Sequence, residues 1–193
     1  GNNIDNDNLG SAPEVLSCSS QILSGGLPVP VYYQNNPNCN WGSFSDRTTV
    51  ADSGCGFTSI AMILTYLTGN TITPARVVQQ YQEQYKVSSG MSHGLATRIA
   101  NDYNLSVSYT NSPSAVVKAL QEGKVVLARG EQSANSGGLF SRGGHFIVLR
   151  GIDDNGHIYI NNPDYGRRGE NTQSFTIDQI DAWATKYWTY AAR

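Results

Sequence analysis

One cysteine and one histidine of this chain stand where nucleophilic attack on a carbonyl would need them. Cys55 begins the most strongly periodic helical pattern, GCGFTSIAMILTYLTG. The backbone N–H groups and dipole at a helix N-terminus stabilise a thiolate, which is the nucleophilic form of cysteine. His145 follows two glycines and opens the strand pattern HFIVLRGI, where a general base would have a rigid support and free space. A buried structural cysteine would have the same local sequence, so the hypothesis depends on His145 pairing with Cys55.

A third group follows from the geometry of a predicted hairpin. The run DDNG at residues 153–156 is a turn signal between two strand patterns. With the turn centred on residues 154 and 155, His145 faces Asp164 across the hairpin. With the turn one residue later, His145 still shares its face with Asn162 and Asp164. Either of these residues could orient the imidazole, and the pattern leaves both open.

The remaining cysteines and histidines are weaker candidates for chemistry. His157 lies beside the predicted turn and should be exposed, and His93 lies near the start of a predicted helix. Cys18 and Cys39 lie in an irregular region. They could form a disulfide with each other or be two unrelated small residues, and the sequence leaves both interpretations equally open. The spacing of the cysteines and histidines matches no metal-ligand pattern, so we expect no metal and no cofactor.

The elements that must position these residues change character along the chain. Helical periodicity covers residues 54–69, with Asp52 or Ser53 as the expected cap and Gly69 after the end. Further helices are predicted at residues 73–86, 93–103 and 112–122. Strands are predicted at residues 105–110, 124–130, 145–152, 157–162 and 173–177, followed by a helix at 178–187 and a short terminal strand. Helices first and antiparallel strands after predict an α+β fold.

Composition limits the classes of function. The chain has 193 residues and a formal net charge of −2, so neither nucleic acid nor an anionic membrane should attract it. No apolar run is long enough to span a membrane. Residues 1–27 are rich in Asn, Ser and Gly and are predicted to be a tail or linker, with one domain at residues 28–193. We expect a monomer.

Three ordered runs resemble one known family. ADSGCGFTSIAMILTYLTGNTITPARV resembles the nucleophile helix of bacterial papain-like peptidases related to the double-glycine leader peptidases of bacteriocin exporters. GGHFIVLRGIDDNGHIYINNPDYG resembles their histidine strand, turn and following strand, and VPVYYQNNPNCNWG resembles their opening strand with its glutamine. The resemblance covers about residues 28–188. It implies a papain-like fold, in which an N-terminal helical lobe packs on a C-terminal antiparallel sheet.

The resemblance also implies roles for particular residues. It implies Cys55 as nucleophile, His145 as base, Asn162 as the residue that orients His145, and Gln34 as the oxyanion donor. Together they would hydrolyse amide bonds through an acyl-thioester on Cys55 without a cofactor. The family usually has aspartate where this chain has Asn162, so Asp164 remains a rival for the third position.

The substrate is less determined than the chemistry. Relatives occur in secreted proteins, often beside domains that degrade cell walls, so the resemblance suggests peptidoglycan peptides as substrate and a secreted or cell-surface location. Proteolysis of leader or target proteins is the main alternative. Acyl transfer would use the same residues, and a papain-like domain that binds peptides without cutting them is a third possibility.

Overall fold

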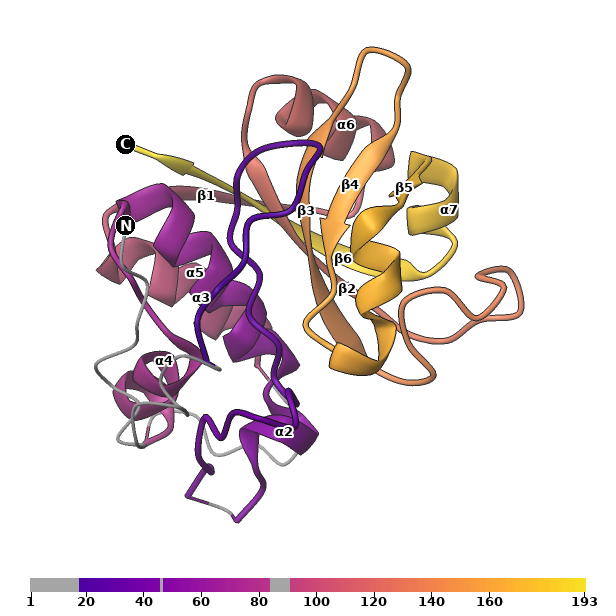
Figure 1. Ribbon diagram of the computed structural model, residues 1–193. Helices are drawn as coiled ribbons and strands as arrows, with labels where there is room; N and C mark the ends of the chain where they lie inside the picture. Colours follow the sequence, from indigo (N-terminus) through magenta and orange to yellow (C-terminus); the bar gives the residue numbers. More distant parts are fainter. Residues whose placement is uncertain (1–17, 46, 84–90) are drawn as a thin grey trace.

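The computed structural model describes residues 18–45, 47–83 and 91–193. It has the predicted α+β architecture (Figure 1). On one side of an antiparallel sheet lie the helices α2 (Val50–Ser53), α3 (Cys55–Thr68), α4 (Pro74–Tyr81) and α5 (His93–Asp102). Two further helices, α6 (Pro113–Gln121) and α7 (Ile177–Asp181), lie against the opposite face. Within these residues no helix is both long and apolar enough to cross a membrane.

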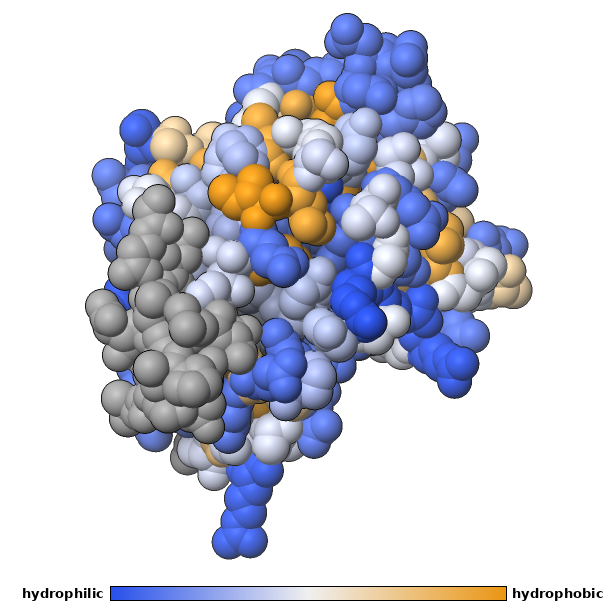
Figure 2. Space-filling view, viewed as in Figure 1, coloured by the Kyte–Doolittle hydropathy of each residue, from blue (hydrophilic) through white to orange (hydrophobic). Residues whose placement is uncertain are grey.

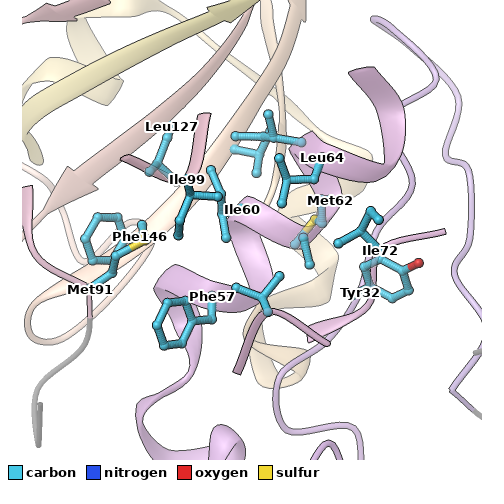
Figure 3. Packing of buried hydrophobic residues seen from close by; sticks show 14 of the residues in the cluster. Tyr32, Phe57, Ile60, Met62, Leu64, Ile72, Met91, Ile99, Leu127 and Phe146 are labelled. Carbon is cyan, nitrogen blue, oxygen red and sulfur yellow. The ribbon is translucent and has the colours of Figure 1, made fainter. Parts of the chain in front are cut away.

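The central helix α3 (Cys55–Thr68) carries the core of the helical lobe. Its apolar side chains pack with residues of the sheet and of neighbouring helices, including Phe146, Leu127 and Ile99 (Figure 3). Gly69 ends the helix in the left-handed conformation, as predicted. The predicted caps are wrong, because Asp52 and Ser53 belong to the short helix α2 (Val50–Ser53) and Gly54 occupies the cap position of α3.

The helices α4, α5 and α6 begin within one residue of the predicted starts. Thr73 caps α4 (Pro74–Tyr81) and Ser112 caps α6 (Pro113–Gln121), each through a side chain that accepts a backbone N–H. The helix α5 (His93–Asp102) follows Ser92. The prediction extended α4 too far, since the helix ends at Tyr81, and residues 84–90 lie outside the described residues.

The described residues form a six-stranded antiparallel sheet in the order β1-β6-β2-β3-β4-β5. Its strands are β1 (Leu105–Thr110), β2 (Val125–Gly130), β3 (His145–Ile152), β4 (Ile158–Asn161), β5 (Ser174–Phe175) and β6 (Ala184–Ala192). Alternate residues of β2 and β3 face the α3 side and the α6 side, and both faces are buried. This double burial explains why β3 is apolar almost throughout.

The predicted last helix is wrong over most of its length. The helix α7 (Ile177–Asp181) spans five residues, and β6 begins at Ala184. Because β6 lies between β1 and β2, both of its edges are hydrogen-bonded and its aromatic side chains Tyr187, Trp188 and Tyr190 are buried. Pairing on both edges outweighs the local helical pattern.

The β3–β4 hairpin differs from both predicted turns. Asp153 pairs with His157 across a three-residue loop. By itself this loop would shift the pairing of β3 with β4 by one residue relative to either predicted turn. A bulge between Leu149 and Gly151 shifts it back, and Val148 pairs with Asn161. Beyond the bulge the register is the one that the first predicted turn implies, and it keeps Asn162 on the face of His145.

Residues 18–27, which the sequence assigned to the tail or linker, contact the domain. Cys18 and Cys39 form a disulfide with a Cα–Cα distance of 5.2 Å. The backbone N–H of Leu27 donates to Arg150 O at 2.6 Å. Residues 1–17 lie outside the described residues, and the boundary at residues 27 and 28 stays a prediction.

Candidate active site

The thiol of Cys55 and the imidazole of His145 are in contact at the junction of the helical lobe and the sheet. Cys55 is the first residue of α3 and His145 the first of β3, and the two side chains share a hydrogen bond. Burial alone would raise the pKa of the Cys55 thiol. The charge and hydrogen bond of His145, with the backbone N–H groups of Phe146 and Gly56, outweigh burial and lower that pKa.

The same contact acts on the histidine in the opposite sense. Burial would lower the pKa of His145. The negative charge and hydrogen bond of the Cys55 thiolate outweigh burial and raise that pKa, and the hydrogen bond of Asn162 and the charge of Asp164 add to the rise. A lowered thiol pKa beside a raised imidazole pKa favours a thiolate–imidazolium pair.

Asn162 lies on the far side of the imidazole from the thiol. Its Oδ1 is 2.8 Å from His145 Nε2, and the residue is fully buried. A carbonyl oxygen can only accept, so His145 Nε2 must carry a proton and Nδ1 is left for Cys55. This is the arrangement that holds an imidazole in one tautomer and one orientation.

Asp164 lies beyond Asn162 and is held by other groups. Its Oδ1 accepts from Asn35 Nδ2 at 2.9 Å and from the Gly166 backbone N–H at 3.0 Å. Asp164 therefore caps the 3₁₀ helix η1 (Tyr165–Thr172), and its charge contributes to the raised pKa of His145. Of the two residues that the hairpin prediction left open, Asn162 has the hydrogen bond to the imidazole.

Gln34 lies at the same site, on the segment that precedes α2. It is buried, and its Nε2 donates to Ala51 O at 2.9 Å. Its backbone N–H donates to Pro163 O at 2.9 Å, which ties the glutamine segment to the end of β4. The structure thus brings Gln34, His145 and Asn162 together from parts of the chain that are far apart in the sequence.

A pocket of about 840 Å³ opens beside His145. Its walls are mostly polar and carry charges of both signs, from Asp52, Arg142, Asp164, Arg167 and Glu170. Gln34 and the glycines at 143, 144, 166 and 169 also line it. Backbone and charged groups, more than apolar surface, therefore meet any bound substrate.

The glycines around the nucleophile have a packing role that the sequence did not reveal. A Cβ atom at Gly54 would lie 2.5 Å from Val50 O, and one at Gly56 would lie 2.8 Å from Met91 Cβ. The close approach of α2 and of Met91 is therefore the reason that the structure provides for glycine at these two positions.

The competing histidines lie apart from this arrangement or outside the description. His157 is exposed and its Nδ1 lies 3.1 Å from Asp153 Oδ2. The side chain of His93 lies outside the described residues. Within the described part of the chain, no group of three or more His, Cys, Asp or Glu side chains could hold a metal ion.

The residues that surround Asn162 carry no pattern in the sequence that predicts them. Glu170 and Asn171 of η1 both contact it: Asn162 Nδ2 donates to Glu170 Oε1 at 2.9 Å, and the Asn162 backbone N–H donates to Asn171 Oδ1 at 2.6 Å. The segment YGRRGENT has neither helical nor strand periodicity, so only its closeness in sequence to Asn162 could have drawn attention to it.

Comparison with known proteins assigns this chain to a family. A profile of the peptidase C39-like family matches residues 26–192. The peptidase domain of Streptococcus ComA, a bifunctional ABC transporter of a quorum-sensing pathway, superposes with a TM-score of 0.51 at 13% identity, over 72% of this chain and 91% of that one. A double glycine motif protease from an AMS/PCAT transporter, solved with its leader peptide, superposes with a TM-score of 0.52 at 19% identity, over 90% and 99%. No curated protein matches.

The helical lobe on an antiparallel sheet is therefore the papain-like fold of a cysteine peptidase. The chain belongs to the peptidase C39-like family, and the resemblance to double-glycine leader peptidases is confirmed.

Proposed function

We propose that Cys55 and His145 hydrolyse amide bonds through a thioester. The Cys55 thiolate attacks the carbonyl carbon, and the imidazolium gives its Nδ1 proton to the leaving amine as the C–N bond breaks. His145 then takes a proton from water, the resulting hydroxide attacks the thioester, and the acid product leaves as Cys55 returns to thiolate. Asn162 keeps the imidazole aimed at the sulfur throughout.

The contact of the Cys55 thiol with His145, which Asn162 holds by its 2.8 Å hydrogen bond, carries this proposal. The opposed pKa shifts of the two groups keep the nucleophile charged before substrate arrives.

We assign the stabilisation of the oxyanion to two hydrogen-bond donors, the side chain of Gln34 and the backbone N–H of Cys55. Gln34 Nε2 has two hydrogens, and its bond to Ala51 O uses one of them. The first N–H groups of a helix have no partner within the helix, so the N–H of Cys55 is available to the oxyanion. Gln34 lines the same pocket as His145.

For the substrate we propose the peptide stems or cross-bridges of peptidoglycan, cleaved outside the cytosol. The pocket beside His145 is polar and has charges of both signs, which suits short peptides that carry free carboxylates and amines. The Cys18–Cys39 disulfide supports a secreted or cell-surface protein, because disulfides persist in oxidising compartments.

Digestion of purified cell walls from several bacteria tests this substrate. The chain should release new free amines at a rate at least about tenfold above that of the Cys55→Ala variant, since removal of the nucleophile abolishes thioester formation. Equal release of free amines by the wild type and the Cys55→Ala variant would contradict the proposed substrate.

A second candidate is proteolysis of leader or target proteins, and the neighbour solved with its leader peptide favours it. Cleavage of ordinary peptides without any release from walls would select this function. Transfer to an added amine in place of water would instead identify an acyltransferase.

A further inference from the structure

We infer that Glu170 is a positioning residue that sets the orientation of the Asn162 amide and makes asparagine, and not aspartate, the residue that this site accepts. The inference rests on the proposed roles of Cys55, His145 and Asn162. It concerns a carboxylate that touches neither the thiol nor the imidazole and acts through Asn162.

All four side-chain hydrogen bonds of Asn162 agree with one orientation of its amide. Oδ1 lies 2.8 Å from His145 Nε2 and accepts the Asp164 backbone N–H at 3.0 Å. Nδ2 donates to Phe140 O at 3.0 Å and to Glu170 Oε1 at 2.9 Å. A flipped amide would place its nitrogen against two donors and its oxygen against two acceptors, so only the observed orientation is satisfied.

Glu170 and Phe140 hold each other as well as the amide. The Phe140 backbone N–H donates to Glu170 Oε2 at 3.2 Å, while its carbonyl accepts from Asn162. Phe140 has a φ of 70°, which is unfavourable for a bulky residue. Its ring is fully buried and packs edge-on against Phe175 and Trp183, so tertiary packing stabilises this backbone. The two acceptors that face Asn162 Nδ2 are thus fixed in place.

Charge makes the site selective between amide and carboxylate. Glu170 Oε2 lies 3.2 Å from Arg167 Nη1, and its side chain is only 14% exposed. An aspartate at position 162 would place a second carboxylate oxygen where Nδ2 now lies, 2.9 Å from Glu170 Oε1. Two carboxylates this close can share a proton only if one pKa rises, and the positive charge of Arg167 opposes that rise. The repulsion should turn the side chain away from His145.

The rate of Cys55 alkylation by iodoacetamide at pH 7 tests this without any substrate, because it reports the thiolate that a well-oriented His145 maintains. Asn162→Asp should lower the rate about tenfold or more, and Glu170→Gln alone should lower it about threefold or less. In the double variant, the amide introduced at position 170 can donate to the carboxylate introduced at position 162, and the rate should recover at least about fivefold over Asn162→Asp. Glu122→Gln, at the end of α6 and remote from the site, is the control and should leave the rate unchanged.

The informative result is that one substitution, Glu170→Gln, slows Cys55 alkylation in the wild type and accelerates it in the Asn162→Asp variant. If the Glu170 carboxylate only stabilised the fold, Glu170→Gln would slow the alkylation of both proteins. A double variant as slow as Asn162→Asp, or an Asn162→Asp variant as fast as the wild type, would overturn the role of Glu170. If Asn162→Asp fails to fold, as judged by thermal unfolding, restored folding in the double variant is the expected rescue and continued failure overturns the inference. Slow alkylation of the wild type itself would overturn the proposed function and this inference together.

Discussion

At the scale of single residues, the site separates orientation from charge. Asn162 supplies a neutral oxygen 2.8 Å from His145 Nε2, while Asp164 supplies a negative charge that helps to raise the pKa of His145. The carboxylate of Asp164 is already bonded to Asn35 and to the backbone of Gly166. The two residues that the hairpin placed on one face should therefore have different effects when changed.

Substitution at these two positions distinguishes the effects. Asn162→Ala should lower kcat by roughly tenfold or more, because the imidazole loses the partner that aims it. Asp164→Asn keeps an acceptor for Gly166 and removes only the charge, so it should change kcat at the pH optimum much less.

The pH profile provides a second measurement. Activity should rise with pH as Cys55 loses its proton, below the usual thiol pKa, and fall as His145 loses its proton, above the usual imidazole pKa. Because the charge of Asp164 favours protonated His145, Asp164→Asn should move the falling limb to lower pH. A larger loss of kcat from Asp164→Asn than from Asn162→Ala would show that Asp164 is the third member of the site.

At the scale of elements, the bulge in β3 keeps Asn162 on the face of His145. Arg150 lies in the bulge and is fully buried. Its guanidinium donates to Ser24 O at 2.9 Å, to Gly25 O at 3.2 Å, to Asn161 Oδ1 at 2.8 Å, to Asn171 O at 3.3 Å and to Ile160 O. One side chain thus joins the N-terminal segment, β4 and η1 at the point where the register shifts.

Replacement of this arginine should destabilise the protein strongly. Arg150→Met removes the donors from several buried carbonyl groups, and we expect the free energy of unfolding to fall by about 3 kcal/mol or more. Denaturation in urea measures the change. Arg98→Met is the matched control, because Arg98 is exposed on α5 and its loss should cost less than about 0.5 kcal/mol. Equal effects of the two variants would mean that the buried network contributes little.

At the scale of the whole molecule, the disulfide closes the segment that carries Gln34. Cys18 and Cys39 are separated by 21 residues, and Gln34 lies between them. The described surface in the view of Figure 2 is mostly hydrophilic, and the large hydrophobic side chains exposed among the described residues are Ile22 and Tyr109. Ile22 lies in the same disulfide-closed segment, whose chain the covalent link restrains.

Removal of the disulfide should lower stability without removing the nucleophile. For a loop of this length, the Cys18→Ser/Cys39→Ser variant should lose about 3 kcal/mol of unfolding free energy. Urea denaturation with and without reductant measures this, and reductant should destabilise the wild type but not the variant. Equal stability of the two proteins without reductant would contradict the prediction.

Local patterns in the sequence determined the parts of this protein that local chemistry controls. The capped helices at Thr73 and Ser112, the left-handed Gly69 and the strands β1 and β3 follow from side chains that bond or pack near their own backbone. The candidate pair Cys55 and His145 was visible in the same way, since each residue begins a strongly patterned element.

Tertiary structure decided the features that depend on distant partners. The strand β6 forms because β1 and β2 bond both of its edges, which local helical propensity cannot reveal. The bulge at Arg150 keeps Asn162 on the face of His145, and the acceptors Phe140 and Glu170 then orient its amide toward the imidazole. These groups are brought to Asn162 by an irregular loop and a 3₁₀ helix, whose conformations follow no period in the sequence, so only the folded chain could show that they meet.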